Sequence, residues 1–274
     1  MHPFDEAIAL SRDAEGVFHG RTTPEYWNMV GPFGGITAAV LLHAVLQHPA
    51  RLGEPAAMTV NFAGPVPEGP FRLLVRPVRT NRSTQHWIIE QHVQDADGGT
   101  SIATTATVLT AARRQTWSAS DFSAPLQGGP QADQPPMALP PGVPSWFRQY
   151  AFVPLEGEMP GAWDGREREG SLSRLWVRKA AERALDFCAL AAFCDVFYPR
   201  VWLRRAHRVP AGTVSITVYF HASGAMLDAA GSDWLLAQAQ GQEFRDTLFD
   251  QTGQVWDRHG NMLATTHQIA YFKE

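Results

Sequence analysis

The stretch Thr59-Val60-Asn61-Phe62 is echoed later in the chain by Thr217-Val218-Tyr219-Phe220, and this repetition decides the fold. A second echo, Ala103-Thr104-Thr105 against Ala264-Thr265-Thr266, begins 41 residues after the first echo ends in one half and 44 residues after it in the other. Either match alone is short. Because both recur in the same order at nearly the same spacing, they fix a common register and predict an internal duplication.

Each echo belongs to a similar succession of expected elements. The first half has a helix over 34–47 and then strands over 58–62 and 71–109; the second has a helix over 181–197 and then strands over 216–220 and 234–272. Both helices end before a proline and are apolar nearly all round, which is typical of buried helices. A buried helix wrapped by a curved antiparallel sheet in each half is an α+β double hotdog; two unrelated α+β domains are the alternative.

The segment between the halves has a different composition. Residues 119–143 are rich in Pro, Gly, Gln and Ser, which predicts a linker that runs over the surface. We therefore expect an N-terminal hotdog unit over 1–114, a Pro- and Gly-rich linker over 115–145, and a C-terminal hotdog unit over 146–274.

The composition is that of a globular protein, with 45% hydrophobic and 18% charged residues among 274. A net charge of −4 gives no basic surface for nucleic acid. The longest apolar stretches, 36–46 and 184–197, are too short to span a bilayer, and the first residues do not resemble a signal peptide. Cys188 and Cys194 fall on opposite faces of one expected helix, too distant to bridge. We expect a cytoplasmic homo-oligomer without membrane or nucleic-acid partners.

Two carboxylates interrupt the second apolar helix. Asp186 lies near its N-terminus, where the helix dipole favours an anion, whereas Asp195 lies in the last turn, where the dipole costs about 0.3–1 kcal/mol. Asp195 is also flanked by Phe193, Val196 and Phe197. A carboxylate in such a place needs a partner or a purpose. Asp195 is therefore a candidate catalytic residue, and the alternative is a polar helix end that reaches solvent.

The first helix has no acid at the matching position. Over 34–46 its polar side chains are Thr37 and His43, and we interpret His43 as a core or helix-end histidine rather than a base. If the two halves are related by pseudo-symmetry, only one of them is equipped with a carboxylate, and one active site per chain is expected.

Thr213 and Gln268 are expected on strands that flank Asp195. Singly, each has an ordinary interpretation, because Thr is common in strands and Gln can face solvent. The chain has no Gly-x-Ser-x-Gly motif, no Cys near a plausible His base, no phosphate loop and no His and Cys cluster with metal-ligand spacing. Any hydrolysis would therefore use water activated directly by side chains, without a metal or a cofactor.

Three short segments carry a resemblance to a known family: Gly31-Pro32-Phe33-Gly34-Gly35 at the start of the first helix, Phe220-His221 at a strand end, and the closing Leu263-Ala264-Thr265-Thr266-His267-Gln268. At these residues the sequence resembles the acyl-CoA thioesterase II family, the bacterial medium- and long-chain acyl-CoA hydrolases, and its wider thioesterase-like superfamily. The resemblance covers nearly the whole chain. It implies the double hotdog fold and hydrolysis of an acyl-CoA, with CoA as part of the substrate.

That family uses an Asp in the second-half helix, a Thr on the following strand and a Gln on the last strand to bind and activate the attacking water. Asp195, Thr213 and Gln268 match these positions in order and in local context, so the resemblance implies that they are the catalytic residues. The chain departs from close family members at Ala222-Ser223, where they have Arg-Pro, and in a shorter Asp-to-Thr interval. Both departures leave the acyl-chain and CoA preference open.

Further residues are candidates for binding the substrate. Gly34 and Gly35 let backbone N–H groups at a helix start approach an oxyanion closely, with helix–sheet packing as an equal alternative. Arg79, Asn81 and Arg82 lie at a strand turn and are candidate contacts for CoA phosphates, with a solvated turn as the more ordinary interpretation. His221 completes the set.

Two other functions stay open. Hydration or dehydration of an acyl thioester on this fold typically pairs an Asp with a His a few residues on, and here no His follows Asp195 until His207. The third possibility is a non-catalytic protein that binds an acyl or aromatic ligand in a hollow between helix and sheet. Activity, rather than sequence, separates it from the enzyme.

Overall fold

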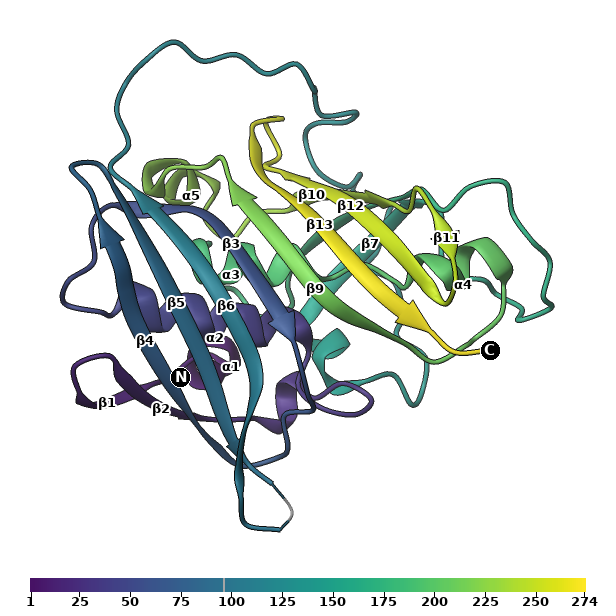
Figure 1. Cartoon of the computed structure of the whole chain (residues 1–274). Coiled ribbons are helices and arrows are strands. Elements are labelled where there is room, and N and C mark those ends of the chain that lie inside the picture. Colours follow the sequence, from purple (N-terminus) through teal and green to yellow (C-terminus); the bar gives the residue numbers. More distant parts are fainter. Residues whose placement is uncertain (96) are drawn as a thin grey trace.

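The computed structural model describes residues 1–95 and 97–274 as two halves, each with a central helix against the strands of a shared sheet (Figure 1). The first half contains α1 (Pro3–Ala7), β1 (Ser11–Ala14), β2 (Val17–Arg21), η1 (Pro24–Tyr26), α2 (Gly34–Leu46), β3 (Glu54–Phe62), β4 (Pro70–Thr80), β5 (Thr84–Gln94) and β6 (Thr100–Ala111). The second contains η2 (Ser145–Gln149), β7 (Tyr150–Glu156), β8 (Ser173–Lys179), α3 (Phe187–Phe193), α4 (Arg200–Arg205), β9 (Ala211–Phe220), α5 (Gly224–Ala230), β10 (Leu235–Gln240), β11 (Phe244–Arg245), β12 (Leu248–Trp256) and β13 (Met262–Phe272).

The strands form one antiparallel sheet in which β3 lies beside β9. Outward from that junction, the order β3-β6-β5-β4-β2 in the first half is matched by β9-β13-β12-β10-β8 in the second. In the same way, α2 comes between β2 and β3 along the chain, and α3 comes between β8 and β9. The α+β class is confirmed, and the predicted duplication has a structural counterpart.

The first echo lies at the junction itself. Thr59 of β3 pairs with Thr217 of β9, and their hydroxyl oxygens are 2.9 Å apart, so equivalent residues face each other as they do at a local two-fold axis. The second echo is one residue out of register, because Phe220 lies opposite Ala264 whereas Phe62 lies opposite Thr104 rather than Ala103. The predicted common register was wrong there: a three-residue match rich in Thr, which is common in strands, is too short to fix an alignment.

The two central helices contact each other, but only α2 lies within one residue of its predicted bounds. α3 covers Phe187–Phe193 rather than 181–197. It begins late because Asp186 is its N-cap, with the carboxylate accepting a hydrogen bond of 2.7 Å from the N–H of Ala189. Pro199 precedes the separate short helix α4. As a consequence, Asp195 lies in the turn after α3 and not in its last helical turn.

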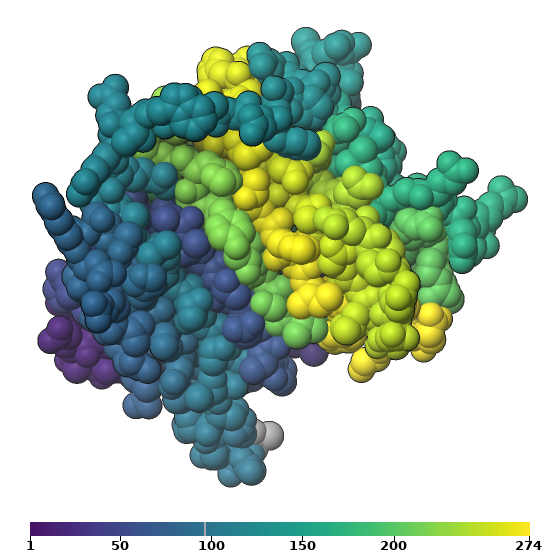
Figure 2. Space-filling view, turned by 45° about the horizontal axis from the view of Figure 1, so that its top comes forward, coloured from purple at the N-terminus to yellow at the C-terminus, as the bar shows by residue number. Residues whose placement is uncertain are grey.

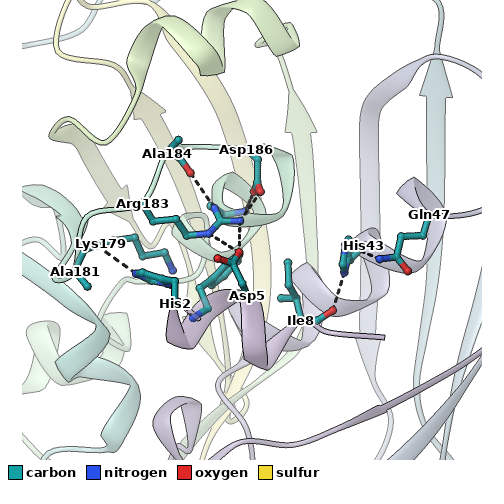
Figure 3. Close-up of polar contacts among 12 residues, drawn as sticks. His2, Asp5, Ile8, His43, Gln47, Lys179, Ala181, Arg183, Ala184 and Asp186 are labelled. Carbon is teal, nitrogen blue, oxygen red and sulfur yellow. Dashed lines mark hydrogen bonds and ion pairs between the residues drawn. The ribbon is translucent and has the colours of Figure 1, made fainter. Parts of the chain in front are cut away.

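The N-terminal segment connects the two halves (Figure 3). The guanidinium of Arg183 lies between Asp5 of α1, at 2.8 Å, and Asp186, at 2.6 Å. A few residues further on, the carbonyl oxygen of Ile8 is 2.7 Å from Nδ1 of His43 on α2. This contact supports the interpretation of His43 as a helix-end residue, and it joins the end of α1 to α2.

The linker crosses the surface from one half to the other (Figure 1, Figure 2). Within 112–144, all of which the structure describes, there is no helix or strand. Arg258 donates a hydrogen bond of 2.7 Å to the carbonyl of Gly128, and the ring of Phe122 stacks on Trp256. The N–H of Met137 then donates to the carbonyl of Phe152 on β7 at 2.7 Å, which returns the linker to the edge of the sheet.

The main buried core extends through both halves and includes the apolar residues of α2 and α3. Cys188 and Cys194 are part of it, and both are free thiols, as expected from their spacing. Among the described residues, no helix has the length and apolar character needed to cross a membrane.

Candidate active site

Three side chains from separate elements meet beside the end of α3. The hydroxyl of Thr213 on β9 donates to the amide oxygen of Gln268 on β13 at 3.1 Å, and the amide nitrogen of Gln268 donates to the carboxylate of Asp195 at 2.9 Å. The same nitrogen lies 3.5 Å from the carbonyl oxygen of Cys194. The structure therefore brings the three predicted catalytic residues together in one hydrogen-bonded row, which we call the Thr–Gln–Asp row.

A β-bulge directs Thr213 toward this row. Ile269 of β13 pairs with Ser215, but the next residue, Ala270, pairs with Thr213, so Val214 is the extra residue. Successive side chains of a strand point to opposite faces of the sheet, and without the bulge Thr213 would point outward. With it, Val214 is turned out and is 39% exposed, while Thr213 lies on the inner face with the row.

The environment of Asp195 sets its acidity. Burial raises the pKa of the Asp195 carboxyl from 3.8 to about 7, because the protein desolvates the charged form. Hydrogen bonds from the Gln268 amide and from the backbone N–H of Gly35 act in the opposite direction and favour the carboxylate. Near neutral pH the Asp195 carboxyl is therefore protonated in part of the molecules and ionised in the rest.

The two glycines at the start of α2 face Asp195. A Cβ on Gly34 would lie 2.7 Å from a carboxylate oxygen of Asp195, and a Cβ on Gly35 would lie 2.7 Å from the carbonyl oxygen of Ala192. Only glycine allows α2 and the turn after α3 to approach this closely. The N–H of Gly35 is directed at the Asp195 carboxylate rather than at a substrate. The predicted role of this glycine pair in holding an oxyanion remains a prediction.

The Thr–Gln–Asp row lies on the wall of a cavity of about 520 Å³. Much of the remaining wall is aromatic and includes Phe33, whose ring stacks on Trp146 with centroids 4.1 Å apart. Tyr198 and Phe249 also line the cavity. Its volume falls within the usual range for small-molecule sites, which are mostly apolar with a few placed polar groups.

The linker contributes to this wall, which the sequence did not reveal. Residues 137–144, from Met137 to Pro144, line the cavity together with the loop around Trp163. The available signal was the apolar run Met137-Ala138-Leu139 inside an otherwise polar segment. Arg208, which follows α4, is a second cavity residue that sequence reasoning missed.

The other predicted substrate-binding residues are not gathered at the cavity. Arg79, near the end of β4, donates a hydrogen bond of 3.1 Å to Asn81 in the β4–β5 connection, which also holds Arg82, and all three residues are exposed. His221 follows the opposite end of β9 from Thr213, and its Nε2 lies 3.0 Å from the hydroxyl of Thr265. None of the four is among the described residues that line the cavity. Their proposed contact with CoA remains a prediction.

The matching place in the first half has different residues. Counting from the Thr59–Thr217 junction, Gln268 corresponds to Val108 and Thr213 corresponds to Pro55. Trp87, which pairs with Val108, is 1% exposed and fills the space with its indole ring. Pairing and burial therefore leave the first half without a Thr–Gln–Asp row.

The arrangement suits proton transfer to and from a water molecule. A carboxyl whose pKa lies near neutrality and which borders an apolar cavity is well suited to act as a general base. Across residues 1–95 and 97–274, no group of three or more His, Cys, Asp or Glu side chains is placed to hold a metal ion.

Comparison with family models covers most of the chain. The model of the acyl-CoA thioesterase N-terminal domain matches residues 23–114, and the model of the acyl-CoA thioesterase C-terminal domain matches residues 124–272. No curated protein matches the chain.

Solved structures show the same fold. A conserved hotdog-fold protein of unknown function from Alicyclobacillus acidocaldarius is 42% identical, with a TM-score of 0.90 over 100% of this chain and 99% of that one. The acyl-CoA thioesterase II TesB2 of Mycobacterium marinum is 16% identical, with a TM-score of 0.73 over 98% of each chain. The tesB protein of Mycobacterium avium subspecies paratuberculosis is 18% identical, with a TM-score of 0.72 over 99% of this chain and 98% of that one. The fold is a hotdog fold.

Proposed function

The chain belongs to the acyl-CoA thioesterase family, and from this premise we propose that it hydrolyses an acyl-CoA to the free acid and CoA in the cavity that holds Asp195. The observation that carries the proposal is the Thr–Gln–Asp row on the wall of that cavity. The row supplies a base of near-neutral pKa beside an apolar space of about 520 Å³.

We also interpret the two halves as a double hotdog with one active site per chain. The strand order mirrored about the β3–β9 junction supports the first part of this interpretation. The second part is supported by Val108 and Pro55, which stand in the first half where the second has Gln268 and Thr213.

In the proposed reaction the carboxylate of Asp195 takes a proton from a water molecule as the water oxygen bonds to the thioester carbonyl carbon. The tetrahedral intermediate then collapses with cleavage of the carbon–sulfur bond. The departing thiolate of CoA takes the proton that Asp195 had accepted from water, so that thioester and water yield acid and thiol without a cofactor. The backbone N–H of Gly34 at the start of α2 is the proposed donor to the oxyanion, because the N–H of Gly35 faces Asp195.

Thr213 and Gln268 have a different part in this mechanism. The Thr213 hydroxyl fixes the orientation of the Gln268 amide, because it donates to the amide oxygen and leaves the nitrogen to face Asp195. The amide nitrogen in turn holds one carboxylate oxygen of Asp195. We propose that this support keeps the second carboxylate oxygen directed at the attacking water.

The function is tested by thiol release from a panel of acyl-CoAs of short to long chain, including aryl-CoAs. We expect kcat/KM of about 10⁴ M⁻¹s⁻¹ or higher for the best substrate, as is usual for enzymes. A folded protein that binds members of the panel but releases thiol from none of them would instead be a non-catalytic acyl-binding protein. Appearance or loss of an enoyl double bond without thiol release would support a hydratase or dehydratase.

The pKa of Asp195 predicts how activity depends on pH. The mechanism requires the carboxylate, and burial raises the pKa of this group to about 7. We therefore expect kcat/KM to rise about tenfold per pH unit up to a pH of about 7 and to level off above it, since kcat/KM reports the pKa of the free enzyme. The measurement is kcat/KM from pH 5 to 9 with the best acyl-CoA. A flat profile across this range would exclude Asp195 as the base.

A further inference from the structure

The cavity wall carries an unpaired positive charge. Arg208 is the only Lys or Arg among the described residues that line the cavity, and its side chain is exposed. Arg205, nearby in sequence, is neutralised by Glu274 at 2.7 Å, whereas Arg208 has no carboxylate within ion-pairing distance in the part of the chain that the structure describes. A free arginine at the edge of an apolar site is suited to bind a phosphate.

Two tryptophans lie beside this arginine. The guanidinium of Arg208 is 5.9 Å from the ring centroid of Trp202, which is buried and fixed by a hydrogen bond of 2.6 Å from its indole N–H to the carbonyl of Val209. Trp163 meets Trp202 edge to face, with centroids 5.9 Å apart, and is 41% exposed. All three line the cavity, and we call them the mouth surface.

Resting on the proposed function, we propose that the mouth surface binds the nucleotide end of CoA, with Arg208 contacting a phosphate and the exposed indole of Trp163 stacking on the adenine. A purine base stacks favourably on an exposed aromatic ring, by about 1–3 kcal/mol per base in single-stranded nucleic acids. A phosphate, in turn, needs a donor that no carboxylate already occupies.

The distribution of apolar side chains gives the direction of the bound substrate. Part of the cavity wall belongs to the main core, with Phe33 and Trp146. Another part belongs to a separate cluster that contains Trp202, against which Arg208 lies, and Phe249. The acyl group is therefore placed against the main core, and CoA along the second cluster toward Arg208.

The test compares acyl-CoA with the N-acetylcysteamine thioester of the same acid, which keeps the thioester and lacks the nucleotide. The ratio measured is kcat/KM for acyl-CoA divided by kcat/KM for the N-acetylcysteamine thioester. We expect Arg208→Gln to lower this ratio by about tenfold and Trp163→Leu to lower it by about threefold to tenfold, mainly through the KM for acyl-CoA. Arg12→Gln, an exposed arginine on β1 outside the cavity lining, is the matched control and keeps the native ratio.

Arg79→Gln provides the competing result. If it lowers the ratio while Arg208→Gln does not, CoA binds at the β4–β5 connection and the mouth surface is excluded.

Binding of free CoA, measured by calorimetry on the same variants, separates this inference from the proposed function. CoA binding that is weakened by Arg208→Gln in a protein without thioesterase turnover would support the mouth surface and contradict the function. Turnover with an unchanged ratio and unchanged CoA binding in the Arg208 variant would support the proposed function and contradict the mouth surface.

Discussion

Replacing Asp195 with asparagine is expected to lower kcat for acyl-CoA hydrolysis by about 10²- to 10⁴-fold, the usual contribution of a general base. Asparagine keeps the shape of the side chain and accepts the hydrogen bond from the Gln268 amide, but it takes no proton from water. The cavity and the mouth surface are unaltered, so binding of acyl-CoA should persist. The measurement is thiol release at saturating substrate, with substrate binding followed separately.

The same substitution has an opposite effect on stability, which distinguishes lost chemistry from lost folding. Burial raises the pKa of Asp195 from 3.8 to about 7, so the folded state favours the protonated form. The stability that this preference gives is complete below pH 3.8 and is lost as the pH rises through about 7. Asp195→Asn avoids the cost of a buried carboxylate and should therefore have a Tm equal to or above the native value at pH 8.

Asp186→Asn is the matched control for this prediction. It changes the other aspartate of the α3 region in the same way, and asparagine is as good an N-cap as aspartate. Activity should remain close to the native value. If thiol release survives in Asp195→Asn, the thioesterase function stands and the base lies elsewhere. If it is lost in both variants, the effect belongs to the geometry of α3 rather than to the carboxylate of Asp195.

Local patterns were sufficient to predict the broad fold. The repeated order of elements depends on alternating and all-apolar patterns that are encoded locally, and the expected α2 matches Gly34–Leu46. The predicted length of α3 was wrong because an aspartate within an apolar helical pattern is also a good N-cap. Asp186 is held by Arg183, three residues before it, and Arg183 is in turn held by Asp5, which it meets only after the N-terminal segment packs against the second half.

Only part of the candidate site could be predicted, because the rest of it also depends on contacts that form in the folded chain. The apolar neighbours of Asp195 indicated a carboxyl with an unusual environment, and the resemblance to a family indicated Thr213 and Gln268. The inward direction of Thr213 depends on a bulge at Val214, which a strand pattern does not reveal. Arg208 and the linker residues 137–144 reach the cavity through tertiary contacts, and the short apolar run Met137-Ala138-Leu139 was the one local feature that set this part of the linker apart from a solvated surface.

The second large effect is expected from a residue without a side chain. Gly34→Ala introduces a Cβ at 2.7 Å from a carboxylate oxygen of Asp195 and at 3.2 Å from the ring of Phe62. Since real Cβ atoms essentially never approach a neighbour so closely, the carboxylate or the start of α2 must move. A displacement of about 1 Å at a reacting group can cost about 10²-fold in rate. We expect kcat to fall by about tenfold to 10²-fold.

The direction of this effect is opposite to what helix propensity predicts, and this makes the experiment decisive. Within a helix, alanine is favoured over glycine by about 1 kcal/mol, so if Gly34 were an ordinary helix residue without a close neighbour, the variant would be at least as stable as the native protein and as active. Gly64→Ala is the control, because a Cβ there would have only an ordinary contact at 3.8 Å. Loss of activity in Gly34→Ala, with a Tm close to native and with Gly64→Ala fully active, would show that the reaction depends on where Asp195 points. Full activity would mean that the carboxylate works from a position other than the one it occupies beside Gly34.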